Sequence, residues 1–392
     1  MNIYKRNSFE KYQFNQPKMK IGVLKETKQG EQRVALSPDV VKQLIKKEFT
    51  VTVEKDAGIG SNFSDEEYKS SGAEIGNAQE VFSADVLLKV NLFTKEEIAQ
   101  MKEGCVCISI MYAYNHPEIL DELNKKSITS FSMDAVPRIS RAQKMDCLSS
   151  QANLAGYKSV ILGANYLEKI FPLMMTASGT ITPAKVLIFG AGVAGLQAIA
   201  TAKRLGAVVE VSDVRPETKE QVESLGGRFL SVEGAEDVKV EGGYASEVSE
   251  EFLQKQKELI QSKIKDSDLV ITTALVMGKK SPILVTEEMV KSMKKGSVIV
   301  DMAVESGGNC EISEKDKILK KHGVTIIGES NLPSLLSTNA SQLYATNIAT
   351  LLLHLASKDG LALDREEEIT KGVLITYQGQ VVHEFTNKIL NK

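Results

Sequence analysis

Short apolar runs alternate with longer amphipathic segments along most of the chain, and this alternation is typical of an α/β fold. Between Met19 and Asp134 the runs predict strands at Lys20–Leu24, Thr50–Glu54, Val86–Val90, Val106–Ile110 and Thr129–Met133. Helices are expected between them at Pro38–Lys47, Asp65–Ser71, Lys95–Met101 and Pro117–Lys125. This first unit therefore has the rhythm of a dinucleotide-binding fold, but it has no glycine-rich phosphate loop.

The alternation of strands and helices stops after Asp134. The polar segment Arg138-Ile139-Ser140-Arg141-Ala142-Gln143-Lys144-Met145-Asp146 follows and precedes a predicted helix at Ser149–Leu162. A second helical segment is expected before Pro183. A more strongly patterned unit follows, with predicted strands at Lys185–Phe189, Val208–Ser212, Arg228–Val232, Leu269–Thr273, Val298–Asp301 and Thr325–Gly328. Its predicted helices are Gly195–Leu205, Glu217–Leu225, Ser249–Ile264 and Glu287–Met293. The polar stretch from Val232 to Ser249 is long for a loop in a compact domain, which indicates a functional or disordered segment.

The last part of the chain contains one long apolar helix, expected at Ser341–Leu355, and a hairpin within Gly372–His383 that turns at Gln378-Gly379. Because an isolated hairpin is only marginally stable, we expect it to pack onto the first unit. The sequence thus predicts an α/β protein with two Rossmann-like domains built on parallel sheets, the second inserted in a discontinuous first domain. Residues 1–18 are expected to be a poorly ordered extension, 19–145 and 341–392 the first domain, and 146–340 the inserted nucleotide-binding domain.

Composition narrows the functional class. Of the 392 residues, 42% are hydrophobic, as is usual for a globular protein. The formal net charge is −3, so the chain has no long-range electrostatic attraction for nucleic acid or an anionic bilayer. No apolar run approaches the ~20 residues of a membrane span, and residues 1–18 lack the apolar core of a secretory signal. Four cysteines are too few for a disulfide framework. We expect Cys105 and Cys107 on opposite faces of one strand, and we predict no metal site.

The strongest motif directly follows the first strand of the second unit. Gly190-Ala191-Gly192-Val193-Ala194-Gly195 lies between the apolar run Lys185–Phe189 and a helical pattern that continues to Leu205. In a dinucleotide-binding loop the first glycine permits the tight turn, the second allows close approach to the pyrophosphate, and the third permits helix–strand packing. Free N–H groups at the helix N-terminus then face the phosphates. The order of strand, loop and helix favours a dinucleotide site over a purely structural turn.

An acidic residue at the end of the next strand indicates which dinucleotide binds. Asp213 lies about 20 residues beyond the loop, where a carboxylate accepts hydrogen bonds from the adenosine ribose. A carboxylate repels the 2′-phosphate of NADP, so Asp213 favours NAD. Arg215 argues in the other direction, because an arginine near this position accommodates that phosphate.

These residues resemble one family closely. Gly190–Gly195 with the following Leu196–Ala207, Asp213-Val214-Arg215, Thr218–Gly227 and Arg138–Asp146 are similar to the soluble NAD(H)-binding component, domain I or the alpha subunit, of proton-translocating nicotinamide nucleotide transhydrogenase. The resemblance runs from about Met19 to the C-terminus. Alanine dehydrogenases share the fold and are the nearest relatives with different chemistry.

The resemblance implies roles for individual residues. Arg138, Gln143, Asp146 and Ser149 match positions around the nicotinamide, and Gln143, with Arg138 and Asp146, is implied to be catalytic by orienting the ring. The positions of the pyrophosphate and adenosine are matched by Gly190, Ala191, Gly192, Val193, Gly195, Asp213, Val214, Arg215 and Leu275. Gly243 and Tyr244 match a mobile loop that closes over nucleotide. Without the resemblance, Arg138 and Asp146 are better interpreted as a solvated interdomain ion pair.

The resemblance also implies the cofactors and partners. This chain is expected to bind NAD(H) and to exchange a hydride directly with NADP(H) held by a separate domain III subunit. A membrane-spanning domain II subunit would couple the exchange to proton translocation. The implied state is a homodimer in the cytoplasm, attached through its partners to the inner face of the membrane, with no nucleic acid partner.

An alanine-dehydrogenase-type enzyme is the main alternative, and a non-catalytic NAD sensor is a third. An amino-acid dehydrogenase needs a general acid or base and a carboxylate anchor. Tyr112 stands where alanine dehydrogenases have their catalytic histidine, unless the local alignment is displaced and His116 takes that place, and Glu305 stands where they have an aspartate. Arg33 and Lys89 resemble their carboxylate anchors, but both also occur in transhydrogenases and do not discriminate.

Overall fold

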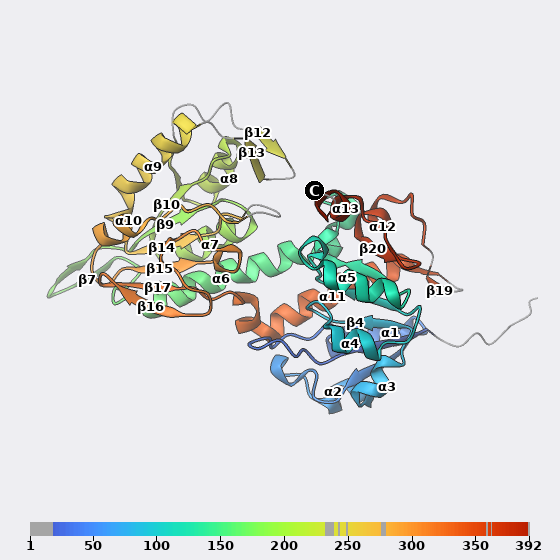
Figure 1. Cartoon of the computed structure of the whole chain (residues 1–392). Coiled ribbons are helices and arrows are strands. Elements are labelled where there is room, and N and C mark those ends of the chain that lie inside the picture. Colours follow the sequence, from blue (N-terminus) through green and yellow to red (C-terminus); the bar gives the residue numbers. More distant parts are fainter. Residues whose placement is uncertain are drawn as a thin grey trace, which may run out of the picture.

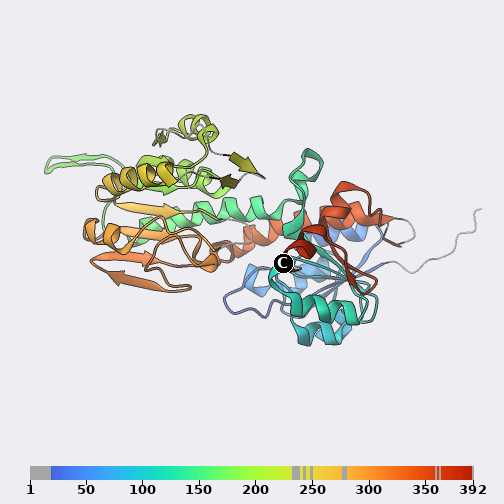
Figure 2. The ribbon, with the colours of Figure 1, turned by 45° about the horizontal axis from the view of Figure 1, so that its top comes forward.

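Two α/β units make up the protein, and two long helices, α6 (Cys147–Tyr166) and α11 (Ser337–Leu355), run between them (Figures 1 and 2). The computed structural model describes residues 19–231, 239–241, 244–247, 250–275, 280–357, 360–361 and 363–390. The predicted extension, residues 1–18, lies outside the described residues. None of the described helices is both long enough and apolar enough to cross a bilayer.

The first sheet contains six parallel strands in the order 3-2-1-4-5-6 that is typical of dinucleotide-binding folds. The tail hairpin extends this sheet, because β20 pairs antiparallel with β6 and with β21. The predicted packing of the hairpin and the discontinuous first domain are therefore confirmed. From one edge the strands are β21 (Gln380–Val381), β20 (Leu374–Tyr377), β6 (Thr129–Ser132), β5 (Val106–Ser109), β4 (Val86–Leu88), β1 (Lys20–Val23), β2 (Thr50–Glu54) and β3 (Glu74–Gly76).

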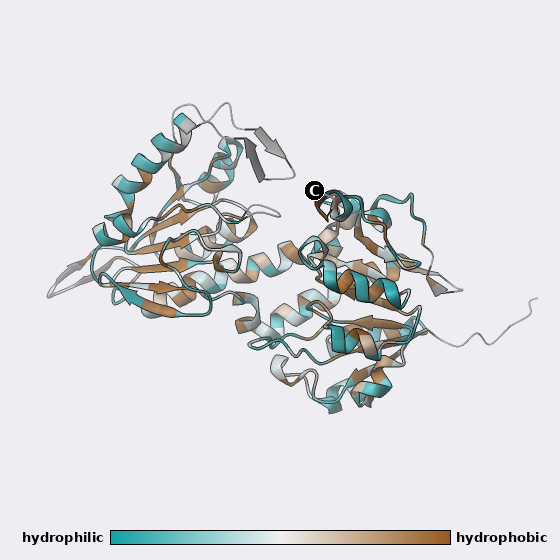
Figure 3. Cartoon of the chain, in the orientation of Figure 1, coloured by the Kyte–Doolittle hydropathy of each residue, from teal (hydrophilic) through white to brown (hydrophobic). Residues whose placement is uncertain are grey.

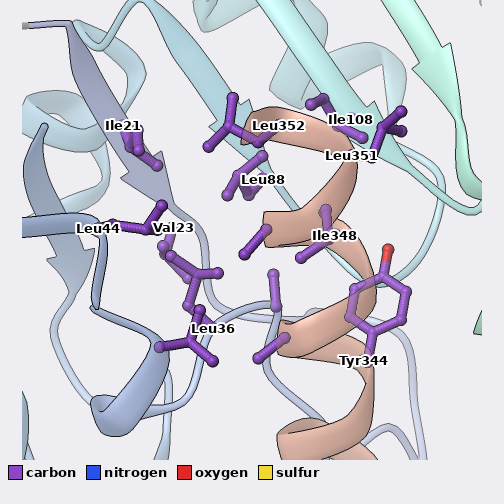
Figure 4. Close-up of a cluster of buried hydrophobic side chains, with 14 of the residues drawn as sticks. Ile21, Val23, Leu36, Leu44, Leu88, Ile108, Tyr344, Ile348, Leu351 and Leu352 are labelled. Carbon is purple, nitrogen blue, oxygen red and sulfur yellow. The ribbon is translucent and has the colours of Figure 1, made fainter. Parts of the chain in front are cut away.

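Helices cover both faces of the first sheet. One face packs against α1 and α11, whose Tyr344, Ile348 and Leu352 lie fully buried among strand residues such as Val23 and Leu88 (Figure 4). Burying side chains of this size stabilises the fold by about 1.5–3 kcal/mol each. The other face packs against α3, α4 and α5. The helices of this unit are α1 (Pro38–Lys46), α2 (Asp65–Ser70), α3 (Ala78–Phe82), α4 (Lys95–Gln100), α5 (Pro117–Lys125), α12 (Glu368–Val373) and α13 (Glu384–Leu390).

The second sheet repeats the same strand order and adds one antiparallel edge strand, β16. Its order reverses between β9 and β14, and open α/β sheets bind ligands at the carboxyl ends of the strands beside such a reversal. The phosphate loop follows β9 directly, so the topology places it at this point. From one edge the strands are β11 (Arg228–Phe229), β10 (Val208–Ser212), β9 (Lys185–Phe189), β14 (Leu269–Thr272), β15 (Val298–Asp301), β17 (Val324–Ile327) and β16 (Ile318–Lys321).

Apolar layers on both faces hold the second unit together. α6 and α7 cover one face, and α9 and α10 cover the other. Figure 3 shows the result, with mostly hydrophobic strands inside and a largely hydrophilic outer surface on α9. The remaining helices are α7 (Val193–Arg204), α8 (Lys219–Ser224), α9 (Glu250–Ile264) and α10 (Glu287–Ser292).

Several short elements differ from the sequence predictions. The prediction of a helix before Pro183 is wrong. β7 (Met174–Thr176) and β8 (Gly179–Ile181) form a projecting hairpin there (Figure 2). Gly179 permits the turn with φ +134°, and the β-branched residues that follow it favour a strand. The stretch from Val232 to Ser249 contains β12 (Lys239–Glu241) and β13 (Tyr244–Glu247) among its described residues. β3, β16 and α3 were not predicted, since each is too short to show a hydrophobic period.

The cysteine prediction needs one correction. Cys105 and Cys107 are buried in the same apolar layer, beside α4 and α5, and not on opposite faces of the sheet. Residues two apart in an extended chain point the same way, which accounts for the difference. Among the described residues no group of three His, Cys, Asp or Glu side chains is arranged to hold a metal ion.

Candidate functional site

The phosphate loop joins β9 to α7 in a geometry that requires glycine at two positions. Gly190 has φ +97°, which side-chain-bearing residues rarely adopt. A Cβ on Gly195 would overlap the carbonyl oxygen of Gly190, so α7 approaches the turn more closely than any other residue permits. A Cβ on Gly192 would meet no atom of the described residues within 4 Å. Packing inside the chain therefore does not account for glycine at position 192.

Asp213, just beyond β10, is bonded to the phosphate loop. Its Oδ2 accepts a 2.6 Å hydrogen bond from the backbone N–H of Ala191. Arg215 donates to the same carboxylate from its backbone N–H, from Nε and from Nη2, at 2.8, 2.9 and 2.8 Å. The Asp213 side chain is only 4% exposed and that of Arg215 17%, so the pair is largely shielded from water. The arginine that made the preference for NAD ambiguous is thus paired with the acid itself.

A third strand end completes the region beside the phosphate loop. Thr273, after β14, donates its hydroxyl to the carbonyl of Phe189 at 3.0 Å. Its neighbour Ala274 is held by the buried Asn309, whose side chain accepts from the Ala274 N–H and donates to its carbonyl, at 3.0 and 2.9 Å. Leu275 follows and is 45% exposed. Sequence reasoning missed Thr273 and Asn309, because their partners are distant in the chain.

The segment implied to face the nicotinamide lies at the start of α6. Residues Ser140–Met145 form a 3₁₀ turn, and the side chains of Arg138 and Gln143 are exposed. Asp146 caps the helix: its Oδ1 accepts from the Ser149 N–H at 2.9 Å and its Oδ2 accepts from the Ser149 hydroxyl at 2.6 Å. Two of the predicted site residues, Asp146 and Ser149, are therefore bonded to each other, and together they define how the segment enters the helix.

Helix α6 joins this segment to the phosphate loop. It packs along α7, and a Cβ on Gly156 would overlap the carbonyl oxygen of Ala194 in the first turn of α7. Gly156 lies ten residues beyond Asp146, a rise of about 15 Å along a helix. The glycine contact therefore sets the position of the Arg138–Asp146 segment relative to the Gly190–Gly195 loop. The sequence showed Gly156 only as one residue of a predicted helix.

In the alternative hypothesis of an amino-acid dehydrogenase, Arg33 and Lys89 would bind the substrate carboxylate. Both side chains are instead neutralised by carboxylates inside the protein. Arg33 is buried and donates to Glu31 through Nε and Nη2, at 2.8 and 2.7 Å, and to Gln151 through Nη1 at 3.0 Å. Lys89 is 1% exposed and donates to both carboxylate oxygens of Glu97, at 2.7 and 2.8 Å. Burial opposes ionisation of Glu31, but the hydrogen bonds and charge of Arg33 outweigh it and hold the pKa well below its usual range.

The position expected for a catalytic histidine is occupied by tyrosine. Tyr112 follows β5 in a left-handed conformation with φ 43°, and its backbone N–H and that of Met111 donate to Asp134. Glu305 on the second unit pairs with Lys28 of the first at 3.5 Å. His116 stands at the N-cap position of α5, where its exposed side chain makes no capping hydrogen bond and lies 3.5 Å from Glu118.

Of the remaining residues predicted for the site, all but Gly243 lie within the described residues. Val214 lies half-buried between Asp213 and Arg215, and Val193 begins α7 with 39% of its surface exposed. Tyr244 begins strand β13, whereas Gly243 lies outside the described residues. The structure thus gathers the loop, Asp213, Arg215 and Leu275 around the ends of β9, β10 and β14, with the Arg138–Ser149 segment attached through α6.

Comparison with known proteins identifies the family. The model of the alanine dehydrogenase/PNT N-terminal domain matches residues 22–155, and that of the C-terminal domain matches residues 159–384. The chain belongs to the alanine dehydrogenase/PNT family. An NAD(P) transhydrogenase subunit alpha polypeptide of Rhodospirillum rubrum is 50% identical over 376 residues, which cover 93% of this chain and 98% of that one.

Two further comparisons place the chain within the alanine dehydrogenase/PNT family. The crystal structure of transhydrogenase from Sinorhizobium meliloti has a TM-score of 0.86 and 45% identity, and the match covers 93% of this chain and all of that one. The alanine dehydrogenase of Staphylococcus haemolyticus is 33% identical over 377 residues, covering 93% of this chain and 94% of that one. The resemblance to transhydrogenase alpha subunits is confirmed, and alanine dehydrogenase is a more distant relative.

Proposed function

We propose that this chain is the NAD(H)-binding subunit of a proton-translocating NAD(P) transhydrogenase. The presence of Arg33 and Lys89 does not discriminate between transhydrogenases and alanine dehydrogenases, and the observation that carries the proposal is that each is paired with a buried glutamate. A dehydrogenase acting on an amino acid needs a free cation for the substrate carboxylate. A transhydrogenase needs none, because both of its reactants are nicotinamides. The relatives at 45–50% identity named as transhydrogenases agree with this choice.

The residues present fit NAD(H). The space beside Gly192, which no described atom fills, is where backbone approaches a pyrophosphate, and the N-terminus of the 12-residue helix α7 directs N–H groups to it. Asp213 lies where the ribose hydroxyls of adenosine would donate, and its charge disfavours a 2′-phosphate. Leu275 and Val193 would offer apolar contact to the nucleotide, and Gly243 and Tyr244 would close over it.

Positioning is the chemistry that this chain would supply. When bound, the nicotinamide carries the hydride that is exchanged. Arg138, Gln143, Asp146 and Ser149 would hold its ribose and carboxamide, with Gln143 orienting the ring toward the second nicotinamide. Such alignment of two reactants removes much of the barrier without a proton donor, which agrees with a tyrosine, not a histidine, at position 112.

The other half of the reaction would lie on partner subunits. We propose that NADP(H) is held by a domain III subunit and that a membrane-spanning domain II subunit couples the exchange to proton translocation. The chain would then be cytoplasmic and attached to the inner face of the membrane through these partners.

We further propose a homodimer, which the projecting hairpin β7–β8 supports. Met174, Met175 and Ile181 on it, and Leu173 directly before it, are 42%, 75%, 44% and 54% exposed, and exposed apolar groups that cluster in this way mark an interface. Met175→Asp should convert the dimer to monomer in sedimentation velocity. Ile59→Asp, at an apolar residue of the first unit that is 58% exposed, should leave the dimer intact.

One experiment tests the proposed activity. The purified chain is mixed with a cognate NADP(H)-binding subunit, and reduction of an NAD analogue by NADPH is followed by absorbance. Hydride exchange is expected, and its absence when both nucleotides are shown to bind would refute the proposal. Alanine-dependent formation of NADH by the chain alone would support the amino-acid dehydrogenase instead. Binding of NAD without turnover with any partner would indicate a sensor.

A further inference from the structure

Asn347, a polar residue within the apolar helix α11, bridges the segment that we propose to hold the nicotinamide and the first turn of α6. Its Nδ2 donates to the backbone carbonyl of Lys144 at 2.8 Å. Its Oδ1 accepts from the hydroxyl of Ser150 at 2.8 Å. Asn347 is only 7% exposed, so water has little access to replace either bond. Lys144 is the immediate neighbour of Gln143.

The bridge belongs to a longer buried hydrogen-bond network. Gln151 donates to the hydroxyl of Ser150 and to the carbonyl of Ala340 on α11, at 3.3 and 3.1 Å, and accepts from Arg33 at 3.0 Å. Glu31, which accepts from Arg33, also accepts from the side chains of Asn331 and Ser334 in the connection between the two units. The network therefore runs from this connection to the carbonyl beside Gln143.

We propose that Asn347 is a positioning residue for hydride transfer. An amide side chain donates and accepts at the same time, which the two partners require, since a carbonyl only accepts and the Ser150 hydroxyl here donates. Asn347 thereby holds the backbone next to Gln143 at a set distance from the start of α6. The inference rests on the proposed function, because it assumes that Gln143 orients the nicotinamide. Asn347 is not one of the residues that we propose to contact a nucleotide.

Substitution by aspartate tests this role. Asn347→Asp keeps the size and the bond from Ser150, but it cannot donate and places a carboxylate against the Lys144 carbonyl. With the full chain and an NADP(H)-binding subunit, we expect single-turnover hydride transfer to slow by about 10- to 100-fold, the scale for a misplaced reactant. The Kd for NAD, from calorimetry, should change by less than about threefold, because the phosphate loop and Asp213 are untouched. A variant that was merely less stable would not produce this split.

Two further variants keep the test decisive. Thr346→Ala on the same helix removes an exposed hydroxyl bonded only within α11, and it should leave rate and affinity unchanged. If Asn347→Asp does not fold, Ser150→Ala removes one end of the bridge and should slow transfer in the same direction. Unchanged hydride transfer in a folded Asn347→Asp protein overturns the inference, and so does equal loss of rate and of NAD affinity.

Amide hydrogen exchange on the chain alone separates this inference from the proposed function. Asn347→Asp should speed exchange of the amides of residues 142–146, whether or not hydride exchange occurs. Faster exchange in that segment, together with no transhydrogenation by the wild type, would leave the structural role of Asn347 standing and refute the proposed function. Unchanged amide exchange would overturn the inference independently.

Discussion

Replacing Asp213 by alanine should change which dinucleotide the protein prefers, because one carboxylate performs two tasks. We propose that it accepts hydrogen bonds from the adenosine ribose, and it neutralises Arg215 through the bonds of 2.8–2.9 Å described above. The Asp213→Ala variant loses both. The ribose hydroxyls lose their acceptor, and the Arg215 guanidinium loses the carboxylate that neutralises it at the place where the 2′-phosphate of NADP would lie.

The size of the change follows from these contacts. Loss of a hydrogen-bond partner that leaves polar groups unsatisfied costs about 1–3 kcal/mol, so NAD binding should weaken by roughly 5- to 150-fold. A hydrogen bond to a charged group contributes about 1.5–3 kcal/mol, so NADP binding should strengthen by at least about tenfold. The two Kd values change in opposite directions, so both effects raise the ratio of the Kd for NAD to the Kd for NADP, which makes that ratio the sensitive quantity.

Calorimetry with NAD and NADP on wild type, Asp213→Ala and the double variant Asp213→Ala/Arg215→Ala separates the contributions. We expect the gain in NADP affinity to vanish in the double variant, since only the guanidinium provides it. Equal NADP affinity in the single and double variants would refute the role given to Arg215. Unchanged NAD affinity in the single variant would remove Asp213 from the nucleotide site.

Three further predictions concern the loop, the nicotinamide segment and pH. Gly195→Ala should abolish measurable NAD binding by calorimetry and lower the melting temperature, because its Cβ overlaps the Gly190 carbonyl. Gln143→Asn should slow hydride exchange far more than it weakens NAD binding, and the reverse pattern would make Gln143 a simple binding residue. Burial tends to raise the pKa of Glu367, but hydrogen bonds from Thr370 and His354 outweigh it and hold the pKa at about 2. Its contribution to stability is therefore complete above about pH 4.5 and lost as the pH falls toward 2. The difference in unfolding free energy between wild type and Glu367→Gln should shrink over that range, and a difference independent of pH would contradict the assignment.

Local pattern was enough to predict the two sheets, the long helix α11 and the phosphate loop. The alternation of buried strands and amphipathic helices repeats over the whole chain, and a glycine-rich loop has a recognisable spacing. The discontinuous first domain also followed from a physical argument, because a terminal hairpin at Gln378-Gly379 needed a sheet to join. The β7–β8 hairpin was missed because its apolar residues face solvent and not a core, so their pattern carries no information about burial.

The roles of residues whose partners are distant in the chain could not be predicted from the sequence. Arg215 looked available for a phosphate until the structure showed it paired with Asp213. Arg33 and Lys89 looked like substrate anchors, because the glutamates that neutralise them leave no mark in a hydrophobic pattern. Asn309 and Asn347 are single amides whose partners lie 35 and 203 residues away, and only the folded chain brings them together.

The discontinuity of the first sheet has a consequence for synthesis on the ribosome. Strand β6 pairs on its outer side with β20, and the bonded residues Ser130 and Thr376 are 246 positions apart. At about 5–20 residues per second the edge of β6 waits on the order of 10–50 s for its partner to emerge. The apolar face that α11 covers is exposed for nearly as long, while the inserted unit is already complete. The nascent chain thus carries an unfinished sheet edge beside a folded domain, and an unpaired strand edge of this kind is prone to pair with other chains until β20 emerges.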